Sequence, residues 1–188
     1  MPPGVSKKLW TVEEVLHMQE AGILAPGKRL ELIRGELMEM SPSGRKHVAA
    51  VARLHLFLIE LLGRRVLIIS QSSIELDPFS APEPDIAVVR YREDFYAEHP
   101  IGPDDIFLFI EVADTSLDFD RKTKGQLYAE YGIPEYWILN LKGQCVEQFQ
   151  LPGKNGYGRR SIVAKEGMLT IPGFDLKISV GEMLGLEI

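Results

Sequence analysis

Hydrophobic and polar positions alternate along the chain with two different periods, and the two periods predict helices and strands. Residues 45–62 repeat apolar side chains at the spacing of an amphipathic helix, and Gly63 follows as a stop. The apolar face of this helix consists of Ala50, Val51, Leu54, Leu58 and Leu61. A shorter helix is predicted over residues 11–21, because Thr11 and Glu14 have the spacing of a capping box.

Strands are predicted where short apolar runs are bounded by glycine or proline. Residues 29–33 and 36–40 flank Arg34-Gly35 and predict an N-terminal β-hairpin. A second hairpin is expected at 136–141 and 146–151. Four further strands are expected, at residues 66–69, 74–76, 86–89 and 106–113. The last two are almost wholly apolar, as in strands that are buried on both faces.

This pattern predicts a single α/β domain over residues 1–188. A chain of 188 residues can bury one substantial core and does not require two. The core is expected at about 28–151. The helix over residues 11–21 precedes it, and peripheral C-terminal strands over 152–188 follow it.

The composition narrows the class of protein. With 45% hydrophobic and 26% charged residues, and with apolar runs too short to span a bilayer, we expect a soluble protein with no membrane partner. The N-terminus lacks an apolar signal segment, so a cytoplasmic location is expected. The single cysteine, Cys145, excludes an internal disulfide. A net charge of −6 argues against a protein that coats nucleic acid nonspecifically.

Two carboxylates occupy positions that call for an explanation. Asp85 follows Pro84 and directly precedes the apolar run 86–89, so its side chain is expected at a strand end. Glu111 interrupts the apolar run 106–113, where an unpaired charge would cost several kcal/mol, as an order of magnitude. Aspartates at strand ends are commonly turn formers, and buried glutamates are commonly members of structural ion pairs. Neither residue alone therefore establishes a site.

The helix predicted after the Glu111 strand carries a lysine on its apolar face. This helix is expected to begin at Asp118 or Asp120 and to run to about residue 131. Lys124 shares a face with Leu127, Tyr128 and Tyr131. Its stem could lie along the edge of the helix with the ammonium in water. Because the helix directly follows the strand, its start is instead expected beside the strand's C-terminal end.

Several segments together match a known pattern. They are Glu31 to Leu37, Ser41-Pro42, His47, Pro84-Asp85, Glu111, the run Asp120 to Lys124, and Gly132-Ile133-Pro134-Glu135-Tyr136-Trp137. This pattern, which covers roughly residues 28–141, resembles the Uma-type (Uma-two) endonuclease-like family of the PD-(D/E)XK nuclease superfamily. The stretch from Gly132 to Trp137 is its most specific element.

The resemblance implies a restriction-endonuclease-like fold of α/β (α+β) class, with a central mixed β-sheet flanked by helices and an N-terminal β-hairpin. It also implies that Asp85, Glu111 and Lys124 are catalytic and that Asp85 and Glu111 are the metal ligands. The usual superfamily pattern has a lysine two residues after the strand glutamate, where this chain has Ala113. The resemblance implies that Lys124 supplies the amine from the next helix.

Three further residues are candidates for the same site. A hairpin turn at Arg34-Gly35 sets Ile33 opposite Glu36 and places Glu31 and Glu36 on one face, where either could be an outer ligand or simply solvated. His47 lies on the leucine face of its helix, where it could orient a water or a phosphate, or be a hydrogen-bonded core histidine.

The expected cofactor is Mg²⁺, or Mn²⁺ in its place, because hard cations prefer carboxylate and phosphate oxygens. Three functions are consistent with these residues. The first is a Mg²⁺-dependent endonuclease that hydrolyses phosphodiester bonds, with DNA as the expected substrate. The second is a non-catalytic nucleic-acid-binding or assembly module that retains the fold, and the third is a phosphodiesterase acting on another substrate. The three unusual placements favour catalysis over the second function. A homodimer is expected by analogy alone, since cutting both strands of a duplex needs two sites.

Overall fold

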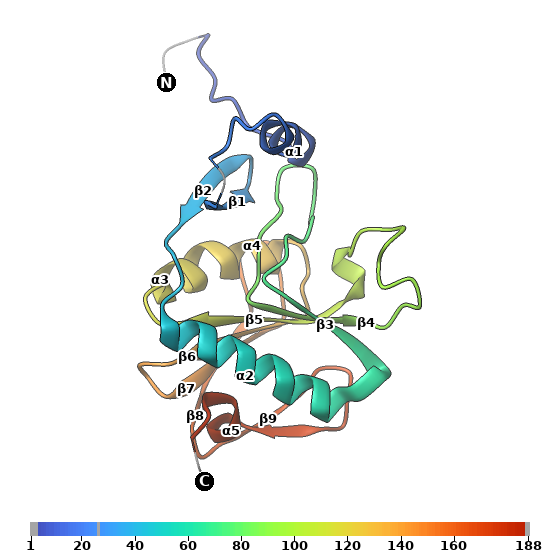
Figure 1. Cartoon of the computed structure of the whole chain (residues 1–188). Coiled ribbons are helices and arrows are strands. Elements are labelled where there is room, and N and C mark those ends of the chain that lie inside the picture. The colour runs from blue at the N-terminus through green and yellow to red at the C-terminus, as the bar shows by residue number, and fades with distance from the viewer. Residues whose placement is uncertain (1–3, 26, 187–188) are drawn as a thin grey trace. The chain divides into compact units, whose positions relative to one another are not determined.

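The chain folds into two compact units (Figure 1). A computed structural model describes residues 4–25 and 27–186. Met1–Pro42 and Ser73–Glu83 form the first, which we call the hairpin unit, and Ser43–Ser72 with Pro84–Ile188 form the sheet unit. The ends of the predicted 1–188 domain, residues 1–3 and 187–188, lie outside the described residues. The organisation as a single domain stays a prediction.

The hairpin unit contains the predicted first helix and the N-terminal β-hairpin. Helix α1 spans Val12–Glu20, and both hydrogen bonds of its capping box, between Thr11 and Glu14, are present. Strands β1 (Arg29–Ile33) and β2 (Glu36–Met40) pair antiparallel with Ile33 opposite Glu36, as predicted. Arg34 and Gly35 both have positive φ, at 50° and 76°, which a two-residue turn between right-twisted strands favours.

The predicted strand at residues 74–76 is wrong. In the structure this segment belongs to a loop over residues 73–83 that closes on itself. The N–H groups of Ile74 and Leu76 donate to the carbonyls of Pro82 and Ser80, within the same loop. Because Pro82 has no N–H to donate in return, these contacts do not extend into a strand ladder.

The sheet unit is built on six hydrogen-bonded strands in the order β3-β4-β5-β6-β7-β8. Their bounds are Val66–Ser70, Ile86–Arg90, Ile106–Ala113, Glu135–Asn140, Cys145–Gln150 and Arg159–Ala164. Strands β5 and β6 pair parallel and the other neighbours pair antiparallel, which confirms the mixed central sheet. Strand β8 pairs along the whole of β7 and forms one edge of the sheet, so it lies at the periphery of the main sheet.

Helices cover both faces of this sheet (Figure 1). Helix α2 (Arg45–Leu62) and the short helix α5 (Val180–Leu184) pack on one face. The other face carries α3 (Leu117–Phe119), the π-helical turn η3 (Asp120–Lys124) and α4 (Gly125–Glu130). The remaining elements are η1 (Gly63–Arg65), η2 (Pro103–Asp105), β9 (Met168–Thr170) and β10 (Lys177–Ser179). No helix within the described ranges 4–25 and 27–186 has the length and apolar character needed to cross a bilayer.

Alternation along β5 decides which helices Glu111 meets. Leu108, Ile110 and Val112 point into the core beneath α2. Phe109 points to the opposite face, where its ring packs edge-on against Tyr128 of α4 at 4.7 Å between centroids. Because successive side chains of a strand alternate, Glu111 shares the face of Phe109 and lies under the helical segment 117–130.

Two buried glutamates share this face of the sheet. The strand register places Glu111 beside Ile138 and Ile138 beside Glu147, so the two carboxylates belong to one row across three strands. The π-helical turn supplies a cation to each of them. Lys124 is ion-paired with Glu111, and Arg121 binds Glu147 with two hydrogen bonds. Arg160 of β8 adds a further bond to Glu147 at 2.8 Å.

We predict that Glu147→Gln destabilises the protein by roughly 2–4 kcal/mol near pH 7, because two arginines would lose their carboxylate partner. Burial raises the pKa of Glu147, but the hydrogen bonds and charges of Arg121 and Arg160 lower it below its ordinary 4.5. The ionised carboxylate therefore stabilises the fold above about pH 4.5, and this contribution is lost as the pH falls through the lowered pKa.

Urea unfolding at about pH 7 and about pH 3.5 measures the free energy of unfolding of the parent protein and of Glu147→Gln. The difference between the two proteins should be smaller at the lower pH. The matched control is Glu166→Gln, at a side chain that is 73% exposed, and it should change the free energy of unfolding by less than about 0.5 kcal/mol. An equal effect of the two variants near pH 7 would contradict a structural role for the Glu147 cluster.

Candidate active site

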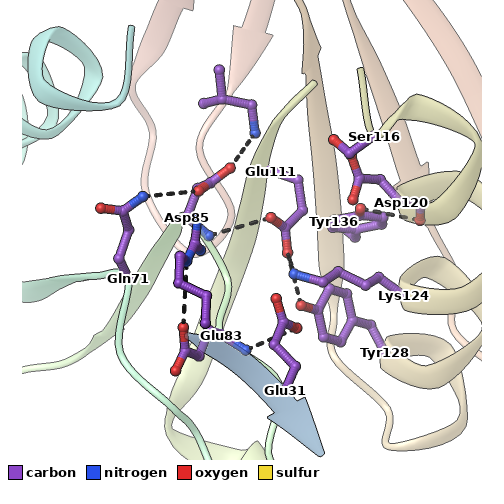
Figure 2. A network of polar contacts seen from close by, with 12 residues as sticks. Glu31, Gln71, Glu83, Asp85, Glu111, Ser116, Asp120, Lys124, Tyr128 and Tyr136 are labelled. Carbon is purple, nitrogen blue, oxygen red and sulfur yellow. Dashed lines mark hydrogen bonds and ion pairs between the residues drawn. The ribbon is translucent and has the colours of Figure 1, made fainter. Parts of the chain in front are cut away.

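The antiparallel register of β4 and β5 brings the two predicted carboxylates together. Ile86 is paired with Ile110, so one further step along each strand sets Asp85 beside Glu111. The backbone N–H of Asp85 donates to Glu111 Oε2 at 3.3 Å. Both side chains are buried, with 5% and 3% of the residue exposed. Figure 2 shows the two carboxylates beside each other at these strand ends.

Asp85 is held by groups from three elements of the sheet unit. Its Oδ2 accepts a hydrogen bond from the N–H of Val112 at 2.9 Å and is hydrogen-bonded to Nε2 of His47, on α2, also at 2.9 Å. The side-chain amide of Gln71, which follows β3, donates to Oδ1 at 3.4 Å. These contacts fix the orientation of the carboxylate.

The surroundings of Asp85 also favour its charged form. Burial by itself raises the pKa of Asp85. The hydrogen bond and charge of His47, the N–H of Val112 and the charge of Lys124 together lower this pKa below its ordinary 3.8. Asp85 is therefore ionised at neutral pH and presents a negative charge at the end of β4.

Glu111 is bound to two side chains of the following helical segment. Lys124 Nζ and Tyr128 Oη each donate to Glu111 Oε1 at 2.9 Å. Lys124 is only 2% exposed, so its ammonium is not in water and the expectation that it lies on the inner face of the helix is confirmed. Figure 2 shows Lys124 and Tyr128 reaching Glu111 from the same side.

A π-helical turn positions Lys124, where a regular helix was predicted. The helical segment begins after Ser116, not at Asp118 or Asp120, because the N–H of Asp120 already donates to the carbonyl of Ser116 at 3.0 Å. Ser116 Oγ also donates to the buried Asp120 side chain at 2.6 Å. Within the turn, the N–H of Gly125 donates to the carbonyl of Asp120, five residues earlier. The wider turn leaves both Asp120 and Lys124 buried, and such turns are frequent at functional sites.

The other predicted site residues fall in different places. His47 contacts Asp85 directly, so it belongs to the same cluster. Glu31 and Glu36 belong to the hairpin unit. There Glu31 accepts the N–H of Glu83 at 3.2 Å, and Glu36 is exposed and ion-paired with Lys7 at 2.5 Å. Their role as outer ligands stays a prediction.

Two contributors were not recognised from the sequence as polar groups of the site. Tyr128 was assigned to the apolar face of its helix, yet its hydroxyl binds Glu111. Gln71 gave no sequence signal, although pairing β3 with β4 places it one residue beyond Ser70 and therefore beside Asp85. A predicted strand order would have identified Gln71, whereas the tyrosine hydroxyl needs the packed helix.

The donor set fits a hard divalent cation that takes few of its ligands from the protein. Within the described residues, no group of three or more His, Cys, Asp and Glu side chains could hold a metal ion. Two carboxylates suffice for Mg²⁺, which keeps several waters, whereas a structural Zn²⁺ site needs about four protein ligands. Asp85 Oδ1 and Glu111 Oε2 accept hydrogen bonds at 3.4 and 3.3 Å, which are long enough to yield to a cation at small cost.

Comparisons with known proteins agree with this fold. The fold is similar to the crystal structure of "a putative nuclease belonging to DUF820" from Anabaena variabilis ATCC 29413, with a TM-score of 0.71 and 15% sequence identity. The similarity covers 93% of this chain and 97% of that one. No curated protein matches the chain.

A family model also matches the sequence, over residues 12–181. That range includes Asp85, Glu111 and Lys124 together with both units of the fold. Because the model spans most of the chain, this protein belongs to the Uma2 family, which is described as "Putative restriction endonuclease".

Proposed function

We propose that this protein is a metal-dependent endonuclease that hydrolyses phosphodiester bonds in DNA. The observation that carries the proposal is the convergence of Asp85, Glu111 and Lys124 from β4, β5 and the π-helical turn. The family description supports a nuclease, and the donor set supports a hard divalent cation.

Asp85 and Glu111 are the residues that would hold Mg²⁺ or Mn²⁺. Such an ion lowers the pKa of a bound water and stabilises negative charge on phosphate oxygens. Asp85, ionised at neutral pH, would supply one oxygen ligand and Glu111 would supply the second. Tyr128 keeps Glu111 oriented through the bond to Oε1, which leaves Oε2 on the side of Asp85.

Lys124 is proposed to stabilise the developing negative charge on the phosphate or to position the attacking water. Its ammonium lies 2.9 Å from Glu111 Oε1, so a phosphate that binds a cation held at Glu111 would come within its reach. The position two residues after Glu111 is Ala113, so it cannot supply an amine. The ion pair with Glu111 explains how Lys124 can take this role from another position. The helix that follows β5 delivers the amine instead.

The first turn of α2 gives the phosphate backbone a place to bind. Arg45 and Lys46 are exposed there, the first turn has no acidic side chain, and the helix has no side-chain cap. Free N–H groups at a helix N-terminus attract phosphate. Because His47 of the same turn contacts Asp85, this cationic end lies beside the site. By analogy with enzymes that cut both strands of a duplex, a homodimer would present two such sites to DNA.

We predict that Asp85→Asn and Lys124→Met each lower Mg²⁺-dependent or Mn²⁺-dependent cleavage of DNA by at least about 100-fold. Single-stranded and double-stranded DNA are tested in parallel by gel electrophoresis. The control is Lys122→Met, since Lys122 is 75% exposed on the same helical turn and should keep full activity. Equal cleavage by all variants would indicate a contaminant, and no cleavage by any folded form would favour a non-catalytic module.

Metal binding can be tested without activity. We predict that Mn²⁺ raises the thermal unfolding temperature, because an ion that binds only the folded state stabilises it. Glu111→Gln should abolish this rise, since one of two ligands is lost. Isothermal titration with Mn²⁺ gives the same comparison at constant temperature. A rise of the same size in Glu111→Gln would place the ion elsewhere and contradict the proposed ligand set.

His47 is proposed to position Asp85 and not to contact substrate. We predict that His47→Asn weakens Mn²⁺ binding by about 10- to 100-fold, as is common when the partner of a ligand is removed. The matched control is His55→Asn on the same helix, because His55 is hydrogen-bonded to Ser70 and not to Asp85. If both variants bind Mn²⁺ like the parent protein, His47 is only a core histidine.

A further inference from the structure

A cavity of about 410 Å³ lies in the sheet unit on the face of the sheet that carries α2. It is bounded by strands β6, β7, β8 and β9 and by the turn over residues 171–174. Its lining includes Glu135, Gln148, Gln150, Thr170, Pro172 and Phe174. Because Glu135 and Trp137 alternate with Tyr136 along β6, they face away from the Glu111 side of the sheet.

The floor of this cavity holds a buried carboxylate whose hydrogen-bond donors are all neutral. Glu135 is 7% exposed. Its Oε1 accepts the indole N–H of Trp137 at 2.6 Å and an amide N–H of Gln148. Its Oε2 accepts an amide N–H of Gln150 at 3.0 Å, across the register that pairs Glu135 with Gln150.

Glu135 differs in this respect from the other buried glutamates of the sheet. Glu111 is neutralised by Lys124, and Glu147 is neutralised by Arg121 and Arg160. Among the described residues, by contrast, Glu135 has no ion pair with a lysine, arginine or histidine. A buried charge is stabilised most by an opposite charge, and a cation that enters the cavity would supply one.

The walls of the cavity suit the apolar part of a ligand. Pro172 and Phe174 line it beside the polar floor. The guanidinium of Arg65 lies 5.6 Å from the centroid of the Phe174 ring. This aromatic wall is therefore compatible with a neighbouring cation. A ligand with one positive end and a short apolar stem therefore matches both parts of the lining.

The residues at this cavity lie apart from the candidate active site. Glu135 and Trp137 belong to the run from Gly132 to Trp137, and the candidate active site uses neither of their side chains. We propose that the cavity is a binding site for an organic cation, an alkylguanidinium or alkylammonium group. Its charge lies on Glu135 Oε2, and its stem packs against Pro172 and Phe174. The site is independent of the proposed nuclease function.

Nuclear magnetic resonance of the two indole N–H groups tests the proposal directly. The chain has two tryptophans, and Trp10 of the hairpin unit serves as an internal reference for Trp137. Titration of the full chain with butylguanidinium should shift the Trp137 indole resonance and leave that of Trp10 in place. The expected dissociation constant is on the order of 1 mM. Butylurea, its neutral isostere, should give no saturable shift.

Three variants connect the shift to the carboxylate. Glu135→Gln should weaken binding by at least about tenfold, because a charge-assisted contact is lost. Glu166→Gln removes the same charge from the exposed turn between β8 and β9 and should bind like the parent protein. Thr170→Phe fills the cavity from the exposed strand β9 and should block binding with Glu135 intact, which keeps the test decisive if Glu135→Gln does not fold.

The proposal is overturned if the Trp137 resonance does not move, if butylurea moves it equally, or if Thr170→Phe and any folded Glu135→Gln bind unchanged. The cation could be a free small molecule or an arginine side chain of a polypeptide. Tighter binding of acetyl-Gly-Arg-Gly-amide than of butylguanidinium supports the polypeptide source, and the reverse order supports the free molecule. Neither result depends on cleavage of DNA.

Discussion

The structure of the sheet unit depends on how it accommodates the charge of Glu111 inside a central strand. A carboxylate in that position is stable only if a cation or several donors reach it. The chain provides both from the next helical segment, through Lys124 and the hydroxyl of Tyr128. The π-helical turn is the local adjustment that keeps Lys124 on the buried face. One electrostatic requirement thus links β5, the turn after it and α4.

The same requirement is met in three different ways across the sheet. Glu147 shares the face of Glu111 and is bound by arginines from two elements, which suits a structural role. Glu111 is ion-paired with Lys124 and lies beside Asp85, which His47 contacts, and we propose that these two carboxylates hold a further cation. Glu135 lies on the opposite face, and within the part of the chain that the structure describes its donors are neutral. We propose that the degree of neutralisation distinguishes a structural glutamate from one that can bind a ligand.

The sequence predicts those structural features that depend on interactions between residues close together in the chain. The capping box of α1 and the turn at Arg34-Gly35 depend on neighbours within a few residues, and the structure has both as predicted. The apolar face of α2 is also present, with Leu62 buried at its end and Leu61 only partly buried. The prediction of a strand at residues 74–76 was wrong, because the hydrogen-bond partners of this segment are set by loop closure at Pro82 and not by its own apolar pattern. The place of β8 at the edge of the main sheet depends on its pairing with β7, which its own pattern does not show.

The sequence by itself determined that Asp85 stands at a strand end, that Glu111 is buried and that Lys124 lies on an inward helical face, because periodicity and burial are properties of short segments. Tertiary structure alone decided that these groups meet. The register of β4 and β5 sets Asp85 beside Glu111, and α2 brings His47 to Asp85 across 38 residues of chain. It also decided that Tyr128 and Gln71 join the cluster and that Glu135 faces a separate cavity. Strand order and helix packing fix such contacts between distant segments, and no local pattern encodes them.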